Sequence, residues 1–278
     1  MISAGNVDEA LQFAYALGIE RLDAMLLLAH RMGQSRVWLL AHGDHSLSAA
    51  ERDAFGADCR QRLDGVPVAY LLGEREFRGL TLRVTPEVLV PRPETEGLVD
   101  WALEWLNAGP LGGLKAPRVL DLGTGSGAVA LAVAKGCPRA RVTATEHSAA
   151  ALSVARDNAE RLGIDVDWRL GDWWQAVGAA RFDLALANPP YVAASDPHLA
   201  ALSHEPAQAL VSGPEGLDDL RRIIGQARAH ADGWLIVEHG WNQAPSVAGM
   251  MLDAGAREIQ TRADLAGHPR ITGGRWAQ

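Results

Sequence analysis

The chain has 278 residues, of which 48% are hydrophobic, and its 26 Lys and Arg against 34 Asp and Glu give a formal net charge of −8. This composition is typical of a globular protein and excludes the fibrous, collagen-like and disordered classes. The length allows one large domain with a smaller partner. The acidic balance gives no general attraction to phosphate backbones, so nucleic acid is a disfavoured partner.

The cysteines and apolar runs indicate the cellular compartment. Cys59 and Cys137 are the two cysteines, so no disulfide framework holds the fold and no C-x-x-C pair offers a zinc or redox site. We see no His, Cys and carboxylate spacing that would bind a metal, and we expect none. No signal peptide is evident, and no apolar run approaches the ~18 residues that span a membrane. We expect a cytoplasmic protein, a monomer, that does not bind membranes.

Residues 1–72 are predicted to be helical, because apolar side chains recur at steps of three and four residues. These residues are Leu11, Phe13, Ala14, Leu17, Leu22, Met25, Leu26, Leu28, Ala29 and Met32. Asn6 with Glu9, and Ser48 with Glu51, have the spacing of helix N-terminal caps. We interpret the region as a small helical bundle that docks a substrate.

Residues 73–92 are predicted to form a β-hairpin that links two domains. The stretch Phe77–Val84 alternates with a period of two residues, and the apolar run Val88–Val90 ends at Pro91.

From residue 93 to residue 278, strand-like apolar runs alternate with helical stretches, which predicts a doubly wound, Rossmann-like α/β sheet. The predicted strands are Arg118–Leu122, Arg141–Thr145, Asp167–Leu170, Phe182–Ala187, Trp234–Glu238, Glu258–Arg262 and Arg270–Trp276. The predicted helices are Thr95–Asn107, Ala128–Lys135, Ala149–Leu162, Leu217–Ala231 and Pro245–Ala254.

A glycine-rich turn follows the first of these strands and indicates a ligand site. Its residues are Gly123, Thr124, Gly125, Ser126 and Gly127. Glycine lets a ligand approach the backbone, and the helix that follows presents free amides. Glu146 ends the next strand, where a carboxylate can accept hydrogen bonds from both ribose hydroxyls. Together these residues predict a nucleoside pocket at the carboxyl edge of the sheet.

The glycine turn alone fits a dinucleotide enzyme or a purely structural turn as well. Two features favour S-adenosylmethionine over NAD. Asp121, directly before the turn, can approach an ammonium group. Asp172 can accept from the adenine amino group while Trp173 packs on the ring, although Trp173 and Trp174 are equally compatible with core packing.

The segment Asn188-Pro189-Pro190-Tyr191 ends the fourth strand at the same edge. The prolines restrict the backbone, so the Asn188 side chain projects into the crevice with little freedom. Its oxygen and the Pro189 carbonyl can accept both protons of a planar NH₂ group and aim the nitrogen lone pair at a methyl group, while Tyr191 covers one face. The alternative is a turn that merely terminates a strand.

These motifs resemble the protein glutamine methyltransferases that modify the Gly-Gly-Gln motif of class 1 peptide chain release factors. The resemblance covers essentially the whole chain. It is carried by Val90-Pro91-Arg92-Pro93-Glu94-Thr95-Glu96, Asp121–Gly127, Asn188–Tyr191, Glu205-Pro206 with Ala209-Leu210, Glu238-His239-Gly240 with Gln243, and Asp264–Arg270.

The resemblance implies a helical N-terminal domain, a hairpin and a seven-stranded S-adenosylmethionine methyltransferase domain over residues 93–278. It implies that Gly123–Gly127 line the methionine and ribose part of S-adenosylmethionine, that Glu146 holds the ribose and that Trp173 borders the adenine. It further implies that Asn188–Tyr191 bind the substrate glutamine amide and that Asn188 also touches the cofactor, with S-adenosylhomocysteine as the product.

Three positions depart from the family pattern. Glu146 stands where Asp is more frequent, Ser126 where Thr is frequent, and His204 where an aromatic residue is expected. Arg92 is a candidate contact to the substrate backbone, and the alternative is that its segment simply begins a helix.

Other functions remain as alternatives. The same tetrapeptide suits the amino group of adenine or guanine in RNA or DNA, but the charge of −8 and the absence of Lys and Arg runs oppose it. A NAD-dependent dehydrogenase and a nucleoside-binding module without turnover are disfavoured by the Asn-Pro-Pro-Tyr segment. We therefore expect methyl transfer to a glutamine side chain of a release factor, which would modulate translation termination.

Overall fold

The computed structural model describes residues 5–276, which divide into two compact units. The N-terminal unit comprises the residues up to Glu74 together with Ala200–His204. The α/β unit comprises Arg75–Leu199 and the residues from Glu205 onward. No helix in the described part of the chain combines the length and apolar character needed to cross a membrane.

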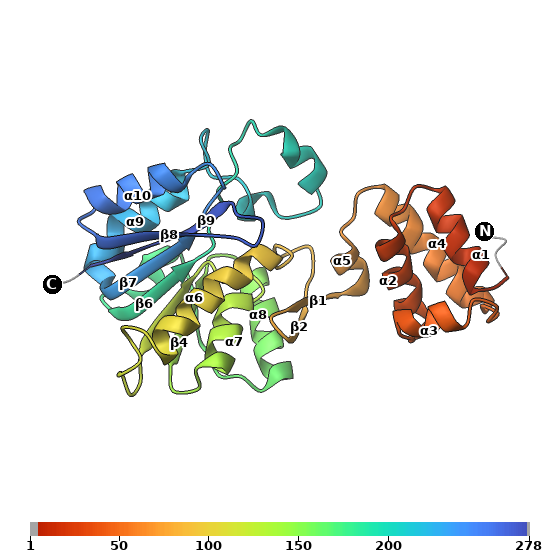
Figure 1. Cartoon of the computed structure of the whole chain (residues 1–278), viewed down its shortest axis with the longest axis horizontal. Helices are drawn as coiled ribbons and strands as arrows, with labels where there is room; N and C mark the ends of the chain where they lie inside the picture. Colours follow the sequence, from red (N-terminus) through yellow and green to blue (C-terminus); the bar gives the residue numbers. More distant parts are fainter. Residues whose placement is uncertain (1–4, 277–278) are drawn as a thin grey trace. The chain divides into compact units, whose positions relative to one another are not determined.

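The N-terminal unit is a helical bundle with its own hydrophobic core (Figure 1). Its helices are α1 (Val7–Ala16), α2 (Arg21–Met32), α3 (Arg36–Ala41), α4 (Ala49–Leu63) and α5 (Val68–Leu72). Both predicted caps are present: Asn6 accepts from the Glu9 amide at 2.9 Å, and Ser48 and Glu51 cap each other reciprocally. The prediction of an N-terminal helical region is confirmed.

The hairpin that follows is shorter than the sequence pattern indicated. Its strands are β1 (Glu74–Phe77) and β2 (Leu80–Arg83), and they turn at Arg78 and Gly79, both with positive φ. The prediction of strand character in Val88–Val90 was wrong. The apolar side chains of Val88 and Val90 are buried, but the Val90 amide donates to the Glu205 carboxylate instead of to a neighbouring strand.

The α/β unit contains a seven-stranded sheet with the order β5-β4-β3-β6-β7-β9-β8, in which β9 is antiparallel to both of its neighbours. The strands are β3 (Arg118–Leu122), β4 (Arg141–Glu146), β5 (Asp167–Leu170), β6 (Phe182–Ala187), β7 (Ala231–Glu238), β8 (Arg257–Ala263) and β9 (Pro269–Arg275). The predicted α/β class and seven strands are confirmed. β7 begins at Ala231, three residues earlier than predicted, so Ala231 belongs to the strand rather than to the preceding helix.

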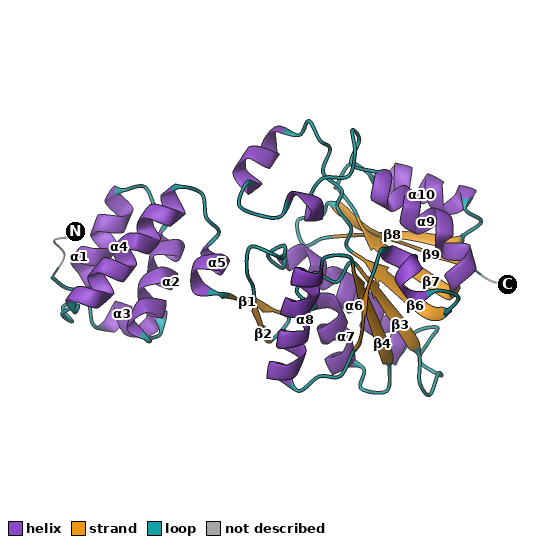
Figure 2. Cartoon of the chain, turned by 180° about the vertical axis from the view of Figure 1, so that it is seen from behind, coloured by secondary structure: helices purple, strands orange, loops and turns teal. Residues whose placement is uncertain are grey.

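Helices cover both faces of this sheet, as Figure 2 shows. They are α6 (Glu96–Asn107), α7 (Ala128–Gly136), α8 (Ala149–Leu162), α9 (Asp218–His230) and α10 (Ala244–Asp253). Alternate strand residues point to opposite faces. Val119 and Leu184 therefore join the core under α6 and α7, while Leu120 and Leu235 join the core under α9 and α10. Two buried layers hold the sheet rigid from both sides.

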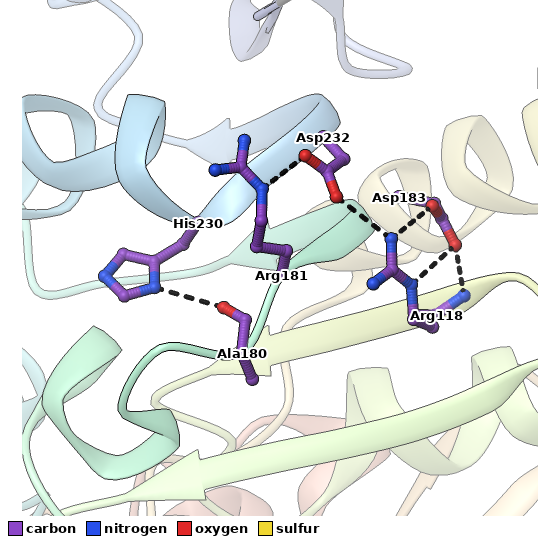
Figure 3. A network of polar contacts seen from close by, with 6 residues as sticks. All are labelled: Arg118, Ala180, Arg181, Asp183, His230 and Asp232. Atoms are coloured by element: carbon purple, nitrogen blue, oxygen red, sulfur yellow. Dashed lines mark hydrogen bonds and ion pairs between the residues drawn. The ribbon is translucent and has the colours of Figure 1, made fainter. Parts of the chain in front are cut away.

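The amino ends of three strands are joined by an ion-pair network (Figure 3). The Arg118 guanidinium at the start of β3 donates to Asp183 of β6 at 2.9 Å and to Asp232 of β7 at 3.2 Å. Arg181 pairs with Asp232 as well. Arg118 is 45% exposed, so each pair contributes at most about 1 kcal/mol to stability. The network therefore connects the amino ends of β3, β6 and β7.

Candidate functional site

A cavity of about 530 Å³ lies at the carboxyl edge of the parallel strands. Its wall includes Gly123, Gly125, Glu146, Asp172, Trp173 and Pro190 among the predicted site residues. A smaller cavity of about 60 Å³ shares Leu89, Gly123 and Gly125 with the first. The wall of the smaller cavity also includes five more predicted site residues: Arg92, Asp121, Thr124, Ser126 and Asn188. The structure thus brings together predicted residues from four strand ends and from the segment before α6.

Three predicted residues lie on neither wall. Pro189 and Tyr191 follow Asn188 but line neither cavity. Gly127 begins α7 behind the glycine turn, where an added Cβ would lie 3.1 Å from Leu131 Cδ1. Gly127 therefore serves helix packing within this structure.

The Glu146 carboxylate is held in place by backbone amides. Its Oε2 accepts from the Gly125 amide at 3.0 Å, and its Oε1 accepts from the Ser148 amide at 2.9 Å. The residue is 7% exposed and lines the larger cavity. Each carboxylate oxygen can accept more than one hydrogen bond, so Glu146 can also accept from a diol. The glutamate thereby connects the end of β4 to the glycine turn.

Asp121 is buried at the end of β3 beside the smaller cavity. Its Oδ2 accepts from the Thr124 hydroxyl at 2.5 Å and from the Ala130 amide at 3.2 Å. Burial, aided by the nearby Glu146 charge, raises the pKa of Asp121 to about 7, although the two hydrogen bonds oppose the rise. A buried carboxylate with few compensating charges favours a cation as its neighbour.

The two adjacent tryptophans have different environments. Trp174 is fully buried, and its Nε1 donates to the Ile223 carbonyl at 2.9 Å. Trp173 lines the larger cavity, where its ring lies against Gly123, and its Nε1 donates to Asp219 at 3.2 Å. Core packing therefore describes Trp174, while Trp173 packs against the same core and also forms part of the cavity wall. Asp172 lines the same cavity but is ion-paired with Arg222, a partner that the sequence pattern did not reveal.

The Asn-Pro-Pro-Tyr segment is connected to residues far away in the sequence. The Asn188 Nδ2 donates to the Thr95 hydroxyl at 3.0 Å, and the Tyr191 hydroxyl donates to Glu238 Oε1 at 3.2 Å. Gln243 donates to the Tyr191 carbonyl at 3.0 Å. Glu238 and Gln243 belong to a motif that carried no assigned role, and Thr95 was not predicted as a site residue.

Glu238 is completely buried at the end of β7. Burial raises its pKa to about 7, while hydrogen bonds from Thr95 and Tyr191 and the charge of Arg270 lower it. Its Oε2 has no hydrogen-bond partner within residues 5–276. Burial likewise raises the pKa of Tyr191, with the adjacent Glu238 charge as the second cause. The tyrosine therefore remains a neutral hydrogen-bond donor near neutral pH.

Arg92 has two structural roles. Its Nη2 donates to Glu205 Oε1 at 2.6 Å, and it directly precedes the 3-10 helix Pro93–Thr95 that leads into α6. The backbone of Arg92 thus precedes a helix start, as one of the two interpretations expected. Its side chain also lines the smaller cavity. His204, the departure from the family pattern, belongs to the N-terminal unit and donates from Nε2 to the Asp64 carbonyl at 2.8 Å.

Asn158 of α8 is a supporting residue that the sequence analysis missed. Its side chain is fully buried and makes three hydrogen bonds: to the Ser126 carbonyl, to the Arg83 carbonyl and from the Arg83 amide. It therefore ties the glycine turn to strand β2. The helical pattern around Asn158 did not indicate this role, because the residues that it hydrogen-bonds lie 32 and 75 positions away in the sequence.

Comparisons with known proteins agree with this geometry. The family model described as PrmC N-terminal domain matches residues 8–73, and the model described as Methyltransferase small domain matches residues 106–213. A crystal structure of a methyltransferase from Pyrococcus furiosus has the same fold, with a TM-score of 0.55 and 17% identity over 80% of this chain and 100% of that one.

Curated relatives match along nearly the full length. The release factor glutamine methyltransferase of Bordetella pertussis is 50% identical over 92% of this chain and 95% of its own. The protein of the same name from Escherichia coli is 38% identical over 97% of both chains. Because these relatives share 38% to 50% of their residues with this chain over nearly its full length, the chain belongs to the family of release factor glutamine methyltransferases.

Proposed function

We propose that this protein transfers a methyl group from S-adenosylmethionine to the side-chain amide nitrogen of the glutamine in the Gly-Gly-Gln motif of class 1 release factors, and thereby modulates translation termination. The observation that carries the proposal is the smaller cavity, where Asn188 lies beside the glycine turn and adjoins the larger cavity. This arrangement provides a donor site and an acceptor site that share a wall.

The described residues fit S-adenosylmethionine. The larger cavity has the volume of a small-molecule site. Glu146 offers an acceptor to the ribose hydroxyls, Trp173 offers an aromatic face to the adenine, and Asp121 offers a buried negative charge to the cationic amino acid end. The cofactor supplies an electrophilic methyl group on a sulfonium. The Gly123 backbone leaves space for it, since it carries no Cβ.

At the acceptor site, the chain binds and orients the amide. The Asn188 side-chain oxygen and the Pro189 carbonyl accept its two N–H groups, and Pro190 and Tyr191 hold this segment at the end of β6. The hydrogen bonds favour positive charge on the nitrogen as it attacks, and they align its lone pair with the methyl carbon. S-adenosylmethionine, when bound, would supply the methyl group, with its sulfur as the leaving group, and the methylated amide would lose one N–H proton to solvent. No residue is assigned as a general base.

The function is tested by methyl incorporation from labelled S-adenosylmethionine into three acceptors: a class 1 release factor, its Gln→Ala variant in the Gly-Gly-Gln motif, and total RNA with DNA. We expect label in the unmodified release factor alone. Label that enters RNA or DNA instead would support methylation of an amino group on a base, the alternative that the tetrapeptide also permits.

Asn158 should position the cofactor site although it lies on neither cavity wall. Replacing Asn158 by Ala removes a buried side chain that hydrogen-bonds to three backbone groups, so we expect a loss of about 3 kcal/mol in the free energy of unfolding. Because Ser126 is released, the Kd for S-adenosylmethionine should rise roughly tenfold. Urea denaturation and calorimetric titration measure the two effects. Asn107→Ala, at the exposed end of α6, is the matched control, and equal effects of both variants would contradict this role.

We further propose that the helical bundle of residues 1–72 docks the release factor, with residues 73–92 as the linker and 93–278 as the catalytic domain. The bundle has a core of its own, so its removal leaves the sheet and its two cores intact. We expect a truncated chain that begins at Gly73 to keep the wild-type Kd for S-adenosylmethionine while its KM for release factor rises at least roughly tenfold. An unchanged KM in a truncation that still binds the cofactor would contradict docking by the bundle.

A further inference from the structure

Hydrogen bonds lead from Asn188 and Tyr191 into the protein interior. The Asn188 Nδ2 donates to Thr95 Oγ1 at 3.0 Å, and Thr95 is in turn one of the groups that lower the pKa of Glu238. The Tyr191 hydroxyl donates to the same carboxylate at 3.2 Å. Thr95 is 4% exposed and Glu238 is 0% exposed, so water does not compete for these contacts. The contacts join three segments that are far apart in the sequence.

The geometry sets the direction of the two bonds that start at this segment. The Asn188 Nδ2 donates to the Thr95 oxygen, and the Tyr191 hydroxyl donates to Glu238 Oε1. A threonine hydroxyl can accept one hydrogen bond while it donates another, so Thr95 keeps its own proton for Glu238. The group of Asn188 that satisfies the Thr95 oxygen is its NH₂. The side-chain oxygen of Asn188 is then the group left for a ligand.

Other titratable groups surround Glu238. Burial and the charge of Glu94 raise its pKa, while Arg270 lowers it. His239, the next residue along the chain, is buried and has a pKa below its ordinary value mainly because of that burial. The segment that precedes Thr95 is held in place because the Arg92 side chain and the Val90 amide both hydrogen-bond to the Glu205 carboxylate. The segment before α6 and the end of β7 are therefore both fixed relative to Asn188.

We propose that Thr95 and Glu238 are positioning residues that fix the Asn188 amide with its oxygen toward the substrate NH₂ group and fix the Tyr191 ring beside it. The inference rests on the proposed function, since an amide donor is what the Asn188 oxygen would accept. A reversed Asn188 amide would present its own NH₂ to the substrate NH₂, and two donors facing each other form no hydrogen bond.

Two pairs of variants test the positioning role. Thr95→Val removes the hydroxyl with little change in shape, and Thr95→Ser keeps it. Glu238→Met removes the acceptor, and Glu238→Gln keeps a carbonyl that both hydroxyls can reach. We expect Thr95→Val and Glu238→Met to lower kcat at least roughly tenfold, with the Kd for S-adenosylhomocysteine within about twofold of wild type. The Ser and Gln variants should recover most of the lost kcat.

Thr145→Val is the control for replacing a buried threonine. Thr145 is 0% exposed, and its hydroxyl has no hydrogen-bond partner within residues 5–276. The Thr145→Val variant should therefore have the same kcat as the wild-type protein. Wild-type kcat in Thr95→Val, or an equal loss in Thr95→Val and Thr95→Ser, would overturn the proposal.

A spectroscopic measurement separates this inference from the proposed function. The side-chain amide NMR resonances of Asn188, assigned by their loss in Asn188→Ala, should show slow proton exchange in the wild type and in Thr95→Ser. They should show fast exchange in Thr95→Val. This result requires no substrate, so it stands even if wild-type protein methylates no release factor. Unchanged exchange in Thr95→Val would contradict the role of the hydrogen bond from Asn188 to Thr95.

Discussion

Replacing Asn188 by alanine is expected to lower kcat by roughly a thousandfold, the largest catalytic effect of any single substitution in this site. The variant loses the side-chain oxygen that binds the substrate amide and favours charge on its nitrogen. Asn188 lines the smaller cavity rather than the larger one. Most of the cofactor affinity should therefore remain. Single-turnover methyl transfer and calorimetric titration with S-adenosylhomocysteine measure the two quantities separately.

The control for this substitution is Asn107→Ala. Asn107 is the last residue of α6, is exposed and lines neither cavity, so kcat should stay at the wild-type value. Near-normal activity of Asn188→Ala would contradict the mechanism. A loss of affinity for S-adenosylhomocysteine as large as the loss of kcat would instead show that Asn188 acts mainly on the cofactor.

Gly123→Ala is expected to cause the largest loss of cofactor affinity, a rise of roughly thirtyfold or more in the Kd for S-adenosylmethionine. Gly123 has a φ of +71°, which disfavours a side chain. An added Cβ would also lie 2.6 Å from Cζ3 of Trp173. The indole would have to move from the wall of the larger cavity, which disturbs the face offered to the adenine.

A matched glycine separates backbone strain from this clash. Gly163 has a similar φ of +64°, but no heavy atom beyond its chain neighbours lies within 4 Å of its added Cβ. Gly163→Ala should lower the free energy of unfolding by about 1 kcal/mol and leave the Kd unchanged. If Gly123→Ala binds S-adenosylmethionine as well as Gly163→Ala does, the contact between the glycine turn and Trp173 has no role in binding.

Much of the sheet could be predicted from the sequence because its central strands are short, mostly apolar runs between helical stretches. Arg118–Leu122 and Phe182–Ala187 begin and end where the pattern placed them, and so does the mostly exposed edge strand Asp167–Leu170. Val88–Val90 shows the limit of such patterns. Its valines are buried, as the apolar run indicated, but a buried run forms a strand only where a neighbouring strand can pair with it, and here the Val90 amide is bound to Glu205.

The residues that support the site were harder to predict than the residues on its walls. Gly123 and Asn188 directly follow strands and Glu146 is the last residue of one, and the carboxyl edge of a parallel sheet brings such positions together. Thr95, Glu238 and Asn158 act through partners 93, 47 and 32 residues away, and their side chains carry no local signal. Trp173 and Trp174 had equivalent sequence contexts. They begin the 3-10 helix Trp173–Val177, in which Trp173 faces the cavity and Trp174 is buried in the core.

In the proposed reaction the methyl acceptor is the side-chain amide nitrogen of a glutamine. Tandem mass spectrometry of a release factor, after incubation with the protein and S-adenosylmethionine, locates the methyl group. We expect the added mass of one methylene on the glutamine of the Gly-Gly-Gln tryptic peptide, and none on the factor incubated with the Asn188→Ala variant. A methyl group on any other residue of the release factor, or none under conditions where RNA or DNA becomes methylated, would contradict the proposed reaction.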